Sequence, residues 1–226
     1  MQFTGYDFFD FGTGKGYCYE FARKKMKLKK GLGFDLNPHK VKNLNKIGIP
    51  CLLQDVTALD LPRKCVRVVT MGHFLEHLKS TDMVYSVLSK ALQTADEYIY
   101  IEGPCFDFDK FLESHNLRFY WSNWVGHPTH VTSTLLISML NDLGISQYSL
   151  VRYGPVNSSQ AACIHPWESP KDQFNYDSNV HSSKVDVKFS YPLYTGMYLF
   201  VWLKDRKNKK DLISLRKKNI RRVYNG

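Results

Sequence analysis

The sequence predicts an α/β domain with a mostly parallel sheet and helices on both of its faces. Short apolar runs that suit buried strands alternate with amphipathic runs that suit helices, from residue 6 to about residue 150. The connections between them are short, which favours right-handed crossovers between parallel strands. Residues with functional chemistry follow the carboxyl ends of these expected strands, which is where such sheets bind ligands.

The composition indicates one cytoplasmic domain. The 226 residues are enough to bury a sizeable core. There is no apolar run long enough for a transmembrane helix, and the chain begins without the basic and apolar pattern of a secretion signal. The five cysteines are scattered and form no Cys-x-x-Cys pair, so we expect reduced thiols and a cytoplasmic location.

Most of the positive charge lies at the C-terminal end. The net charge is +10, and residues 204–226, with ten Lys or Arg and two Asp, carry +8 of it. The difference, +2, is left for the rest of the chain. We therefore expect a nearly neutral domain over residues 1–204 and a basic tail over residues 205–226. Such a tail is typical of a solvated chain end, or of a basic amphipathic helix that binds acidic surfaces such as RNA.

A glycine-rich turn joins the first expected strand to the first expected helix. Residues 6–11 form an apolar and aromatic run, Gly12, Gly14 and Gly16 follow at alternate positions, and residues 17–26 have a helical pattern. Glycines let a backbone turn tightly and approach a ligand, and a helix N-terminus offers free N–H donors. This arrangement predicts a nucleotide site.

The spacing of these glycines argues against two common nucleotide sites. A dinucleotide fingerprint has the spacing Gly-x-Gly-x-x-Gly, but its third glycine would fall at Tyr17. A P-loop needs Ser or Thr after its lysine, but Lys15 is followed by Gly16. Asp10, two residues before the first glycine, would repel a pyrophosphate and suits a ligand with an amino group.

The segment Asp10-Phe-Gly-Thr-Gly-Lys-Gly16 resembles the first motif of the class I S-adenosylmethionine-dependent methyltransferases, and Leu75-Glu-His77 resembles a segment after their fourth strand. The resemblance extends over about residues 5–150. It implies a Rossmann-like, mostly parallel seven-stranded sheet whose last strand is antiparallel, S-adenosylmethionine as cofactor, and cofactor contacts from Thr13 beside the glycines. Because the first strand starts almost at Met1, helices that often cap the family's pocket are missing. A second copy of the chain is then a candidate lid, in a homodimer.

The second expected strand, residues 30–35, ends in an acidic residue. Its carboxylate, on Asp35, can accept hydrogen bonds from both hydroxyls of a ribose, with Leu36 beside it. The structural alternative is that Asp35 caps the helix that starts near Pro38.

The third expected strand, residues 49–53, is followed by Asp55 and Val56. The resemblance implies that Asp55 contacts the adenine amino group and that Val56 covers the ring. Asp60 in the same loop is a rival for the acidic role.

The fourth expected strand, residues 66–71, is followed by Gly72 and His73. The resemblance places this strand end beside the methionine part of the cofactor, so we expect Gly72 and His73 to contact it. His73-x-x-Glu76-His77 also has the spacing of an inverted zinc-protease motif, whose histidines would share a helix face. Because the motif directly follows a strand and no acidic third-ligand helix follows it, we expect no tightly bound metal.

After the fifth expected strand, residues 106–131 are unusually aromatic. They form either a loop packed over the sheet or one wall of an acceptor pocket. His127 and His130 precede the helix expected at residues 135–143. With His73 they are the candidate general bases, since histidine can exchange a proton near neutral pH, although His127 and His130 are equally well explained as structural residues.

The last two expected strands are residues 146–153 and 197–203, and residues 154–196 form an insertion between them. A hairpin needs only a few residues, and long loops in compact domains are usually functional or disordered. The aromatic residues of the insertion indicate an ordered cover.

These observations predict an enzyme that uses S-adenosylmethionine to methylate a small-molecule acceptor. One alternative is an RNA-directed methyltransferase that binds nucleic acid through the basic tail. The others are a catalytically silent nucleotide-binding module and, with less support, an NAD-dependent oxidoreductase.

Overall fold

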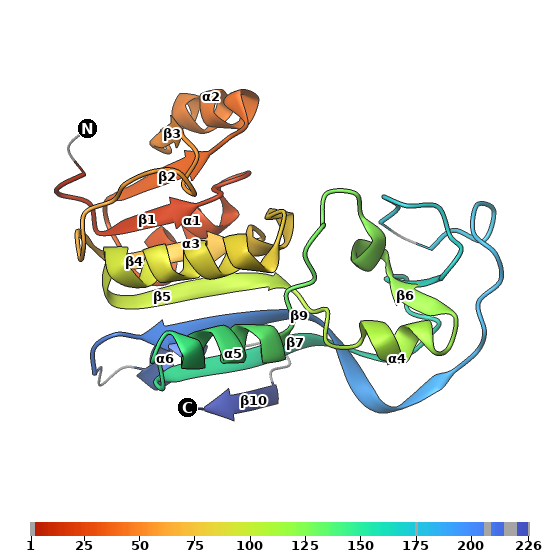
Figure 1. Ribbon diagram of the computed structural model, residues 1–226. Helices are drawn as coiled ribbons and strands as arrows, with labels where there is room; N and C mark the ends of the chain where they lie inside the picture. The colour runs from red at the N-terminus through yellow and green to blue at the C-terminus, as the bar shows by residue number, and fades with distance from the viewer. Residues whose placement is uncertain (1–2, 175, 206–208, 215–220, 226) are drawn as a thin grey trace.

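The computed structural model describes residues 3–174, 176–205, 209–214 and 221–225. A body built on one large sheet carries most of the chain, and a smaller lobe extends from one side of it (Figure 1). In chain order the elements are β1 (Phe8–Phe11), α1 (Tyr17–Lys24), β2 (Gly31–Asp35), α2 (Pro38–Lys46), β3 (Cys51–Leu53), β4 (Val66–Gly72), η1 (Leu75–His77), α3 (Thr81–Thr94), β5 (Ala95–Pro104), α4 (Asp109–Glu113), β6 (Leu117–Phe119), η2 (Tyr120–Asn123), α5 (Ser133–Asp142), β7 (Tyr148–Ser158), β8 (Ile164–Pro166), β9 (Lys188–Trp202), α6 (Lys209–Ser214) and β10 (Arg221–Asn225).

The large sheet has the strand order β10-β7-β9-β5-β4-β1-β2-β3. Strands β3, β2, β1, β4 and β5 pair in parallel, whereas β9 lies antiparallel between β5 and β7. This arrangement confirms the expected Rossmann-like α/β fold, in which the last of the expected strands is antiparallel. One further strand, β10, pairs with β7 at the sheet edge.

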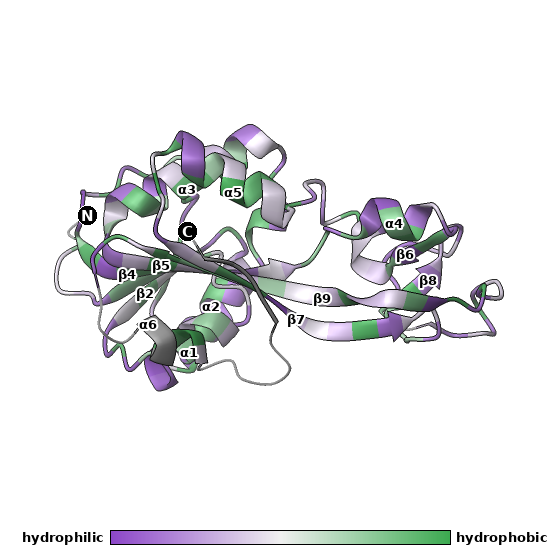
Figure 2. Cartoon of the chain, turned by 90° about the horizontal axis from the view of Figure 1, so that it is seen from below, coloured by the Kyte–Doolittle hydropathy of each residue, from purple (hydrophilic) through white to green (hydrophobic). Residues whose placement is uncertain are grey.

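Alternation along the strands divides the apolar core into two layers. In β5, Ile99 and Ile101 belong to the layer that contains the buried side chains of α3 and α5. Tyr98 and Tyr100 belong to the layer that contains those of α1, α2 and α6. Because successive side chains of a strand point to opposite faces, both faces of this sheet need a helical cover. Figure 2 shows the two groups of helices on opposite sides of the sheet. No helix in the described ranges is long and apolar enough to cross a membrane.

The lobe combines two segments that are far apart in the sequence. Strands β7 and β9 continue beyond the body as long antiparallel arms, as Figure 2 shows. Beside them the short strands β6 and β8 pair antiparallel. Aromatic and aliphatic side chains form a shared core, among them Phe106, Phe119, Ile164 and Leu193. Residues 106–131 and 154–196, expected as a loop and an insertion, therefore fold largely as one unit.

The C-terminal segment packs on the body. Leu212 and Ile213 of α6 are buried in the layer that also contains α1 and α2, and the Tyr198 hydroxyl donates to the Ile213 carbonyl oxygen at 3.2 Å. Strand β10 covers an edge of β7 that would otherwise expose unpaired backbone groups. The expectation of a solvated tail is therefore wrong for Leu212 and Ile213, which are buried, and the described residues 209–214 and 221–225 form a helix and a strand. Residues 206–208, 215–220 and 226 lie outside the described ranges.

Candidate functional site

A cavity of about 1130 Å³ lies at the carboxyl ends of the parallel strands. Because these strands run in the same direction, the segments that follow them meet at one edge of the sheet. Figure 1 shows that the lobe lies on this side of the body. The expected cofactor residues on the cavity wall are Gly12, Thr13, Gly14, Asp35, Leu36, Asp55, Val56, Gly72 and His73. The fold thus brings together all of the expected cofactor residues except Asp10 and Gly16.

The turn between β1 and α1 holds three glycines, Gly12, Gly14 and Gly16, at positive φ. Gly12 has a φ of +68°, and a Cβ atom there would lie 2.3 Å from the ring of Phe74. Gly14 has a φ of +58°, and its N–H donates to the Asp35 carboxylate at 2.7 Å. Positive φ is costly for residues with a Cβ atom. Gly16 is the N-cap residue of α1 and does not line the cavity.

Asp10 lies in β1 next to the turn. Its side chain is fully buried, and its Oδ1 accepts a hydrogen bond from the Thr70 hydroxyl at 2.7 Å. Its Oδ2 is buried without a hydrogen-bond partner among the described residues. Burial raises the pKa of Asp10 to about 7, and the Thr70 hydrogen bond opposes this shift. The structure therefore places Asp10 behind the cavity wall, where it can influence a ligand only through the turn.

Asp35 ends β2 and holds the glycine turn in place. Its Oδ2 accepts from the N–H of Gly14 at 2.7 Å, and its Oδ1 accepts from the N–H of Asn37 at 2.8 Å. A carboxylate has about four acceptor sites, so these two bonds leave capacity for a ligand. The side chain of Asn37, and not that of Asp35, caps α2 by accepting from the N–H of His39. Leu36 beside the site is 65% exposed, which suits contact with an apolar ligand face.

The segment after β3 brings one acidic side chain to the cavity. Asp55 lines it, and the Asp55 Oδ1 accepts from the N–H and the hydroxyl of Thr57 at 2.9 and 2.7 Å. The neighbouring Val56 is buried and contributes an apolar part of the wall. Asp60 lines a different cavity, together with Tyr85. Only Asp55 of these two carboxylates is therefore positioned at the site.

The residue that follows β4 has an unusual backbone conformation. His73 has a φ of +50°, which costs on the order of 1–3 kcal/mol for a residue with a side chain. Its N–H donates to the Glu102 carbonyl oxygen at 2.8 Å, which ties the turn to β5. Strained backbone at a cavity wall is typical of functional sites, so this conformation supports a role for the turn after β4.

His127 does not line the cavity, although it lies near it. The His127 ring is buried, and its centroid is 4.9 Å from that of His77, which does line the cavity. Its Nδ1 lies 3.0 Å from the Trp121 carbonyl oxygen. Burial lowers the pKa of His127, and the Glu76 carboxylate opposes this shift.

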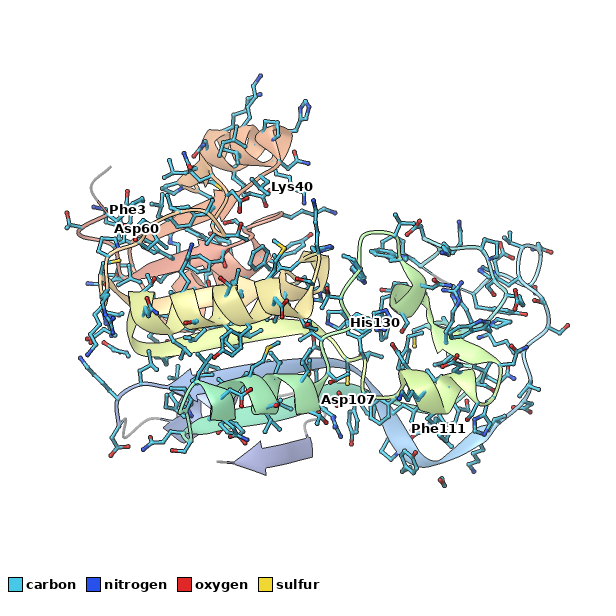
Figure 3. The ribbon with its side chains drawn as sticks, in the orientation of Figure 1. Phe3, Lys40, Asp60, Asp107, Phe111 and His130 are labelled. Atoms are coloured by element: carbon cyan, nitrogen blue, oxygen red, sulfur yellow. The ribbon has the colours of Figure 1, made fainter. Side chains whose placement is uncertain are left out.

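His130 belongs to a second cavity, of about 550 Å³. Its Nδ1 lies 2.8 Å from the Asp109 carboxylate, and its ring stacks on Phe106. The hydrogen bond with Asp109 raises the pKa of His130, and burial opposes the shift. Figure 3 shows His130 and Asp107 where the chain passes from the body to the lobe, and Phe111 within the lobe. Of the three candidate bases, only His73 lines the larger cavity.

Glu102 is a site residue that the sequence analysis did not single out. It lies near the end of β5 and lines the cavity. Its carboxylate accepts hydrogen bonds from the hydroxyls of Tyr100 at 2.7 Å and Tyr153 at 3.0 Å. The available signal was its position: Glu102 follows an apolar run at a strand end, as Asp35 does.

No protein-family model matches the chain, and a search of curated proteins found no match. Solved structures do match its fold. An S-adenosylmethionine-dependent methyltransferase from Archaeoglobus fulgidus has a TM-score of 0.60 and 17% identity, over 88% of this chain and 87% of that one. One from Thermotoga maritima, described as a possible histamine N-methyltransferase, has a TM-score of 0.55 and 14% identity, over 88% and 83%. The magnesium protoporphyrin IX methyltransferase from Synechocystis, with bound SAH, has a TM-score of 0.51 and 14% identity, over 90% and 76%. The chain therefore has the fold of S-adenosylmethionine-dependent methyltransferases.

Proposed function

We propose that the protein is an S-adenosylmethionine-dependent methyltransferase that acts on a small-molecule acceptor. The observation that carries the proposal is the combination of groups on one cavity wall: a glycine turn, carboxylates at successive strand ends, and apolar side chains between them. The fold shared with S-adenosylmethionine-dependent methyltransferases supports the same cofactor.

The groups on the cavity wall fit S-adenosylmethionine. Asp35 has acceptor capacity for the ribose hydroxyls, and Asp55 can accept from the adenine amino group. Leu36 and Val56 provide apolar surface for the adenine ring. Glu102, held by two tyrosine hydroxyls, offers a carboxylate to the ammonium group of the methionine part.

The bound cofactor would supply an electrophilic methyl group on its sulfonium. The chain's own part is to position the acceptor, to exclude water and to accept a proton from the acceptor. His73 is the candidate base because, of the three candidate histidines, it is the one that lines the cavity. The Glu76 Oε1 lies 3.4 Å from the His73 Nδ1, which is a charge contact without hydrogen-bond geometry.

The distribution of charge favours a small acceptor over RNA. Apart from residues 204–226 the chain has a net charge of only +2, and no described residue of this basic segment lines the cavity. Binding to RNA draws much of its affinity from Lys and Arg contacts with phosphates. The cavity wall itself carries Lys15, Lys40 and Lys79 together with the carboxylates of Asp35, Asp55 and Glu102, so it is mixed in charge and is not a basic groove.

Calorimetric titration of the full chain with S-adenosylmethionine, S-adenosylhomocysteine and NAD tests the proposal. We expect one site that binds the first two compounds and does not bind NAD. Binding of NAD alone would favour the oxidoreductase. If none of the three compounds binds, the proposal of a nucleotide site is wrong. Cofactor binding with salt-dependent methylation of RNA would replace the small acceptor by RNA.

A further inference from the structure

Glu76, His77 and His127 form a cluster at the edge of the large cavity. One nitrogen or oxygen atom from each side chain lies within 4.8 Å of those from the other two. Glu76 and His77 belong to η1, directly after β4, whereas His127 comes from the segment before α5. A hydrogen bond links the two segments: the Thr129 hydroxyl donates to the Leu78 carbonyl oxygen at 2.6 Å.

Backbone carbonyls fix the hydrogen positions on both imidazole rings. The His77 Nδ1 lies 2.6 Å from the Gly126 carbonyl oxygen, and the His127 Nδ1 lies 3.0 Å from the Trp121 carbonyl oxygen. A carbonyl oxygen can only accept, so each Nδ1 carries the hydrogen and the Nε2 of a neutral ring keeps its lone pair. Histidines that bind metals usually donate their other ring nitrogen in this way. Both rings are therefore prepared to act as ligands through Nε2.

Glu76 brings a negative charge that protein groups do not fully satisfy. The residue is only 2% exposed, and its Oε1 is buried without a hydrogen-bond partner among the described residues. The His73 Nδ1 lies 3.4 Å from this oxygen. A buried carboxylate oxygen without a hydrogen bond is costly, and a cation in the cluster would remove the cost.

We propose that Glu76, His77 and His127 bind a divalent transition-metal ion, for which zinc is the best match. Two imidazole nitrogens and one carboxylate oxygen are a ligand set that zinc commonly takes. Bonds of about 2.0–2.1 Å in a tetrahedral site place ligand atoms roughly 3.3 Å apart, so the cluster must close by up to about 1.5 Å. His77 is the exposed member of the cluster, and a turn of its ring about the hydrogen bond to Gly126 would bring its Nε2 towards the other two ligand atoms.

The site would keep an open position beside the cavity. Three protein ligands leave room for a water molecule or an oxygen of the acceptor in a four-coordinate zinc site. Because His77 lines the cavity, this position lies within reach of a molecule bound there. The sequence analysis expected no metal because no third ligand follows the His-x-x-Glu-His segment. The fold supplies that ligand from a distant segment, as His127.

Metal titration of the full chain, stripped with a chelator and studied without S-adenosylmethionine, tests this proposal. We expect one zinc ion per chain by calorimetry, and visible absorption from four-coordinate cobalt when Co²⁺ is added instead. Removing a residue that only contacts a metal ligand typically weakens metal binding 10–100-fold. Glu76→Gln and His127→Asn each remove a ligand itself, so we expect them to weaken zinc binding by more than this. His130→Asn is the matched control, since His130 lies in the same segment and pairs with Asp109 outside the cluster. It should bind zinc as the wild type does.

Absence of stoichiometric zinc would overturn the proposal, and so would equal affinity in the wild type and both cluster variants. Loss of binding in His130→Asn would point to a different site and would also overturn it. Circular dichroism of the metal-free variants shows whether they fold. If a buried substitution prevents folding, His77→Gln replaces it, because the His77 side chain is exposed. Since no cofactor is present, the result is independent of the proposed methyltransferase activity.

Discussion

At the scale of single residues, the partners of each carboxylate decide what it can do. Asp35 accepts from two backbone N–H groups and remains at the cavity wall, where it can also accept from a ligand. Glu102 accepts from two tyrosine hydroxyls and lines the same wall. Asp10 is fully buried and accepts from the Thr70 hydroxyl, and burial raises its pKa to about 7. We therefore expect Asp10 to couple the stability of the fold to pH, whereas Asp35 and Glu102 are placed to contact a ligand in the cavity.

Replacing Asp10 by Asn should change how stability depends on pH. Because the pKa of Asp10 is about 7 in the fold and 3.8 in the unfolded chain, the folded state binds more protons between these values. The stability that this proton uptake gives the wild type is fully present below pH 3.8 and is lost as the pH rises through about 7. Between pH 5 and pH 8 the wild type should therefore lose roughly 3 kcal/mol of unfolding free energy that Asp10→Asn, which has no proton to lose, keeps.

Urea unfolding at several pH values measures this shift. Asp7→Asn is the control, because backbone hydrogen bonds, chiefly from Lys30, lower the pKa of Asp7 in the fold. Asp7 is then ionised in both the folded and the unfolded state from pH 5 to pH 8, so its variant should give a stability curve parallel to that of the wild type over this range. Parallel stability curves for the wild type and Asp10→Asn would show that Asp10 does not titrate in this range.

Some site residues could be identified from the sequence and others could not. Asp35 is the last residue of β2 and Asp55 lies two residues after the end of β3. The carboxyl end of a parallel strand is a position that sequence order reveals. Asp55 could not be separated from Asp60 because only the path of the loop decides which side chain reaches the cavity. The proximity of His127 to Glu76 depends on tertiary packing between distant segments, for which sequence spacing carries no signal.

At the scale of elements, the lobe depends on one buried arginine. The guanidinium group of Arg118, in β6, donates to the carbonyl oxygens of Trp167 at 3.1 Å, Ser169 at 2.6 Å and Pro170 at 3.1 Å. Arg118 is almost completely buried. It therefore joins β6 to the segment after β8, in addition to the short ladder between these two strands.

Arg118→Met should destabilise the lobe. Methionine preserves much of the side-chain volume but leaves the buried Ser169 carbonyl oxygen without its donor, and an unsatisfied buried group costs about 1–3 kcal/mol. The carbonyl oxygens of Trp167 and Pro170 are partly buried and can bond to water instead. We expect a loss of roughly 1–3 kcal/mol of stability and faster proteolysis within residues 154–187. Limited proteolysis with mass spectrometry measures the effect, with the exposed Lys171→Met as control. Equal cleavage rates in Arg118→Met and Lys171→Met would exclude this role for Arg118.

The body's strands and helices could be predicted from the sequence, but the lobe could not. Helix α3 follows the N-cap Ser80 and α5 follows the N-cap Thr132, and Ser and Thr before an apolar periodic run are signals of a helix start that a sequence carries. In contrast, β6 and β8 are three residues long, too short to show alternation, and they pair across a long stretch of chain. The arms of β7 and β9 extend into residues that resemble a loop in composition, because pairing with each other stabilises them there.

At the scale of the whole molecule, the C-terminal segment completes the body. Leu212 and Ile213 fill part of the core layer on the α1 side, and β10 covers the edge of β7. The basic composition of residues 204–226 predicted a solvated end because the charges outnumber the apolar residues. The few apolar side chains nevertheless decide where the described part of this segment lies.

Removing these apolar contacts should lower stability without affecting the cavity. The double variant Leu212→Ser/Ile213→Ser loses two buried side chains, each worth about 1.5–3 kcal/mol. We expect a loss of roughly 3–6 kcal/mol in the free energy of unfolding. Ile47→Ser, at a side chain that is 71% exposed, is the control and should change stability little. Thermal unfolding gives the comparison, and equal midpoints for both variants would show that α6 does not contribute to the core.

The affinity of Asp35→Ala for S-adenosylmethionine tests the central claim most directly, because this carboxylate links the glycine turn to the end of β2 on the cavity wall. Loss of hydrogen bonds to a charged group costs about 1.5–3 kcal/mol, so calorimetry should show roughly 10–150-fold weaker binding. Asp60→Ala removes a carboxylate that lies on a different cavity, and it should bind like the wild type. Wild-type affinity in a folded Asp35→Ala variant would contradict the proposed cofactor site.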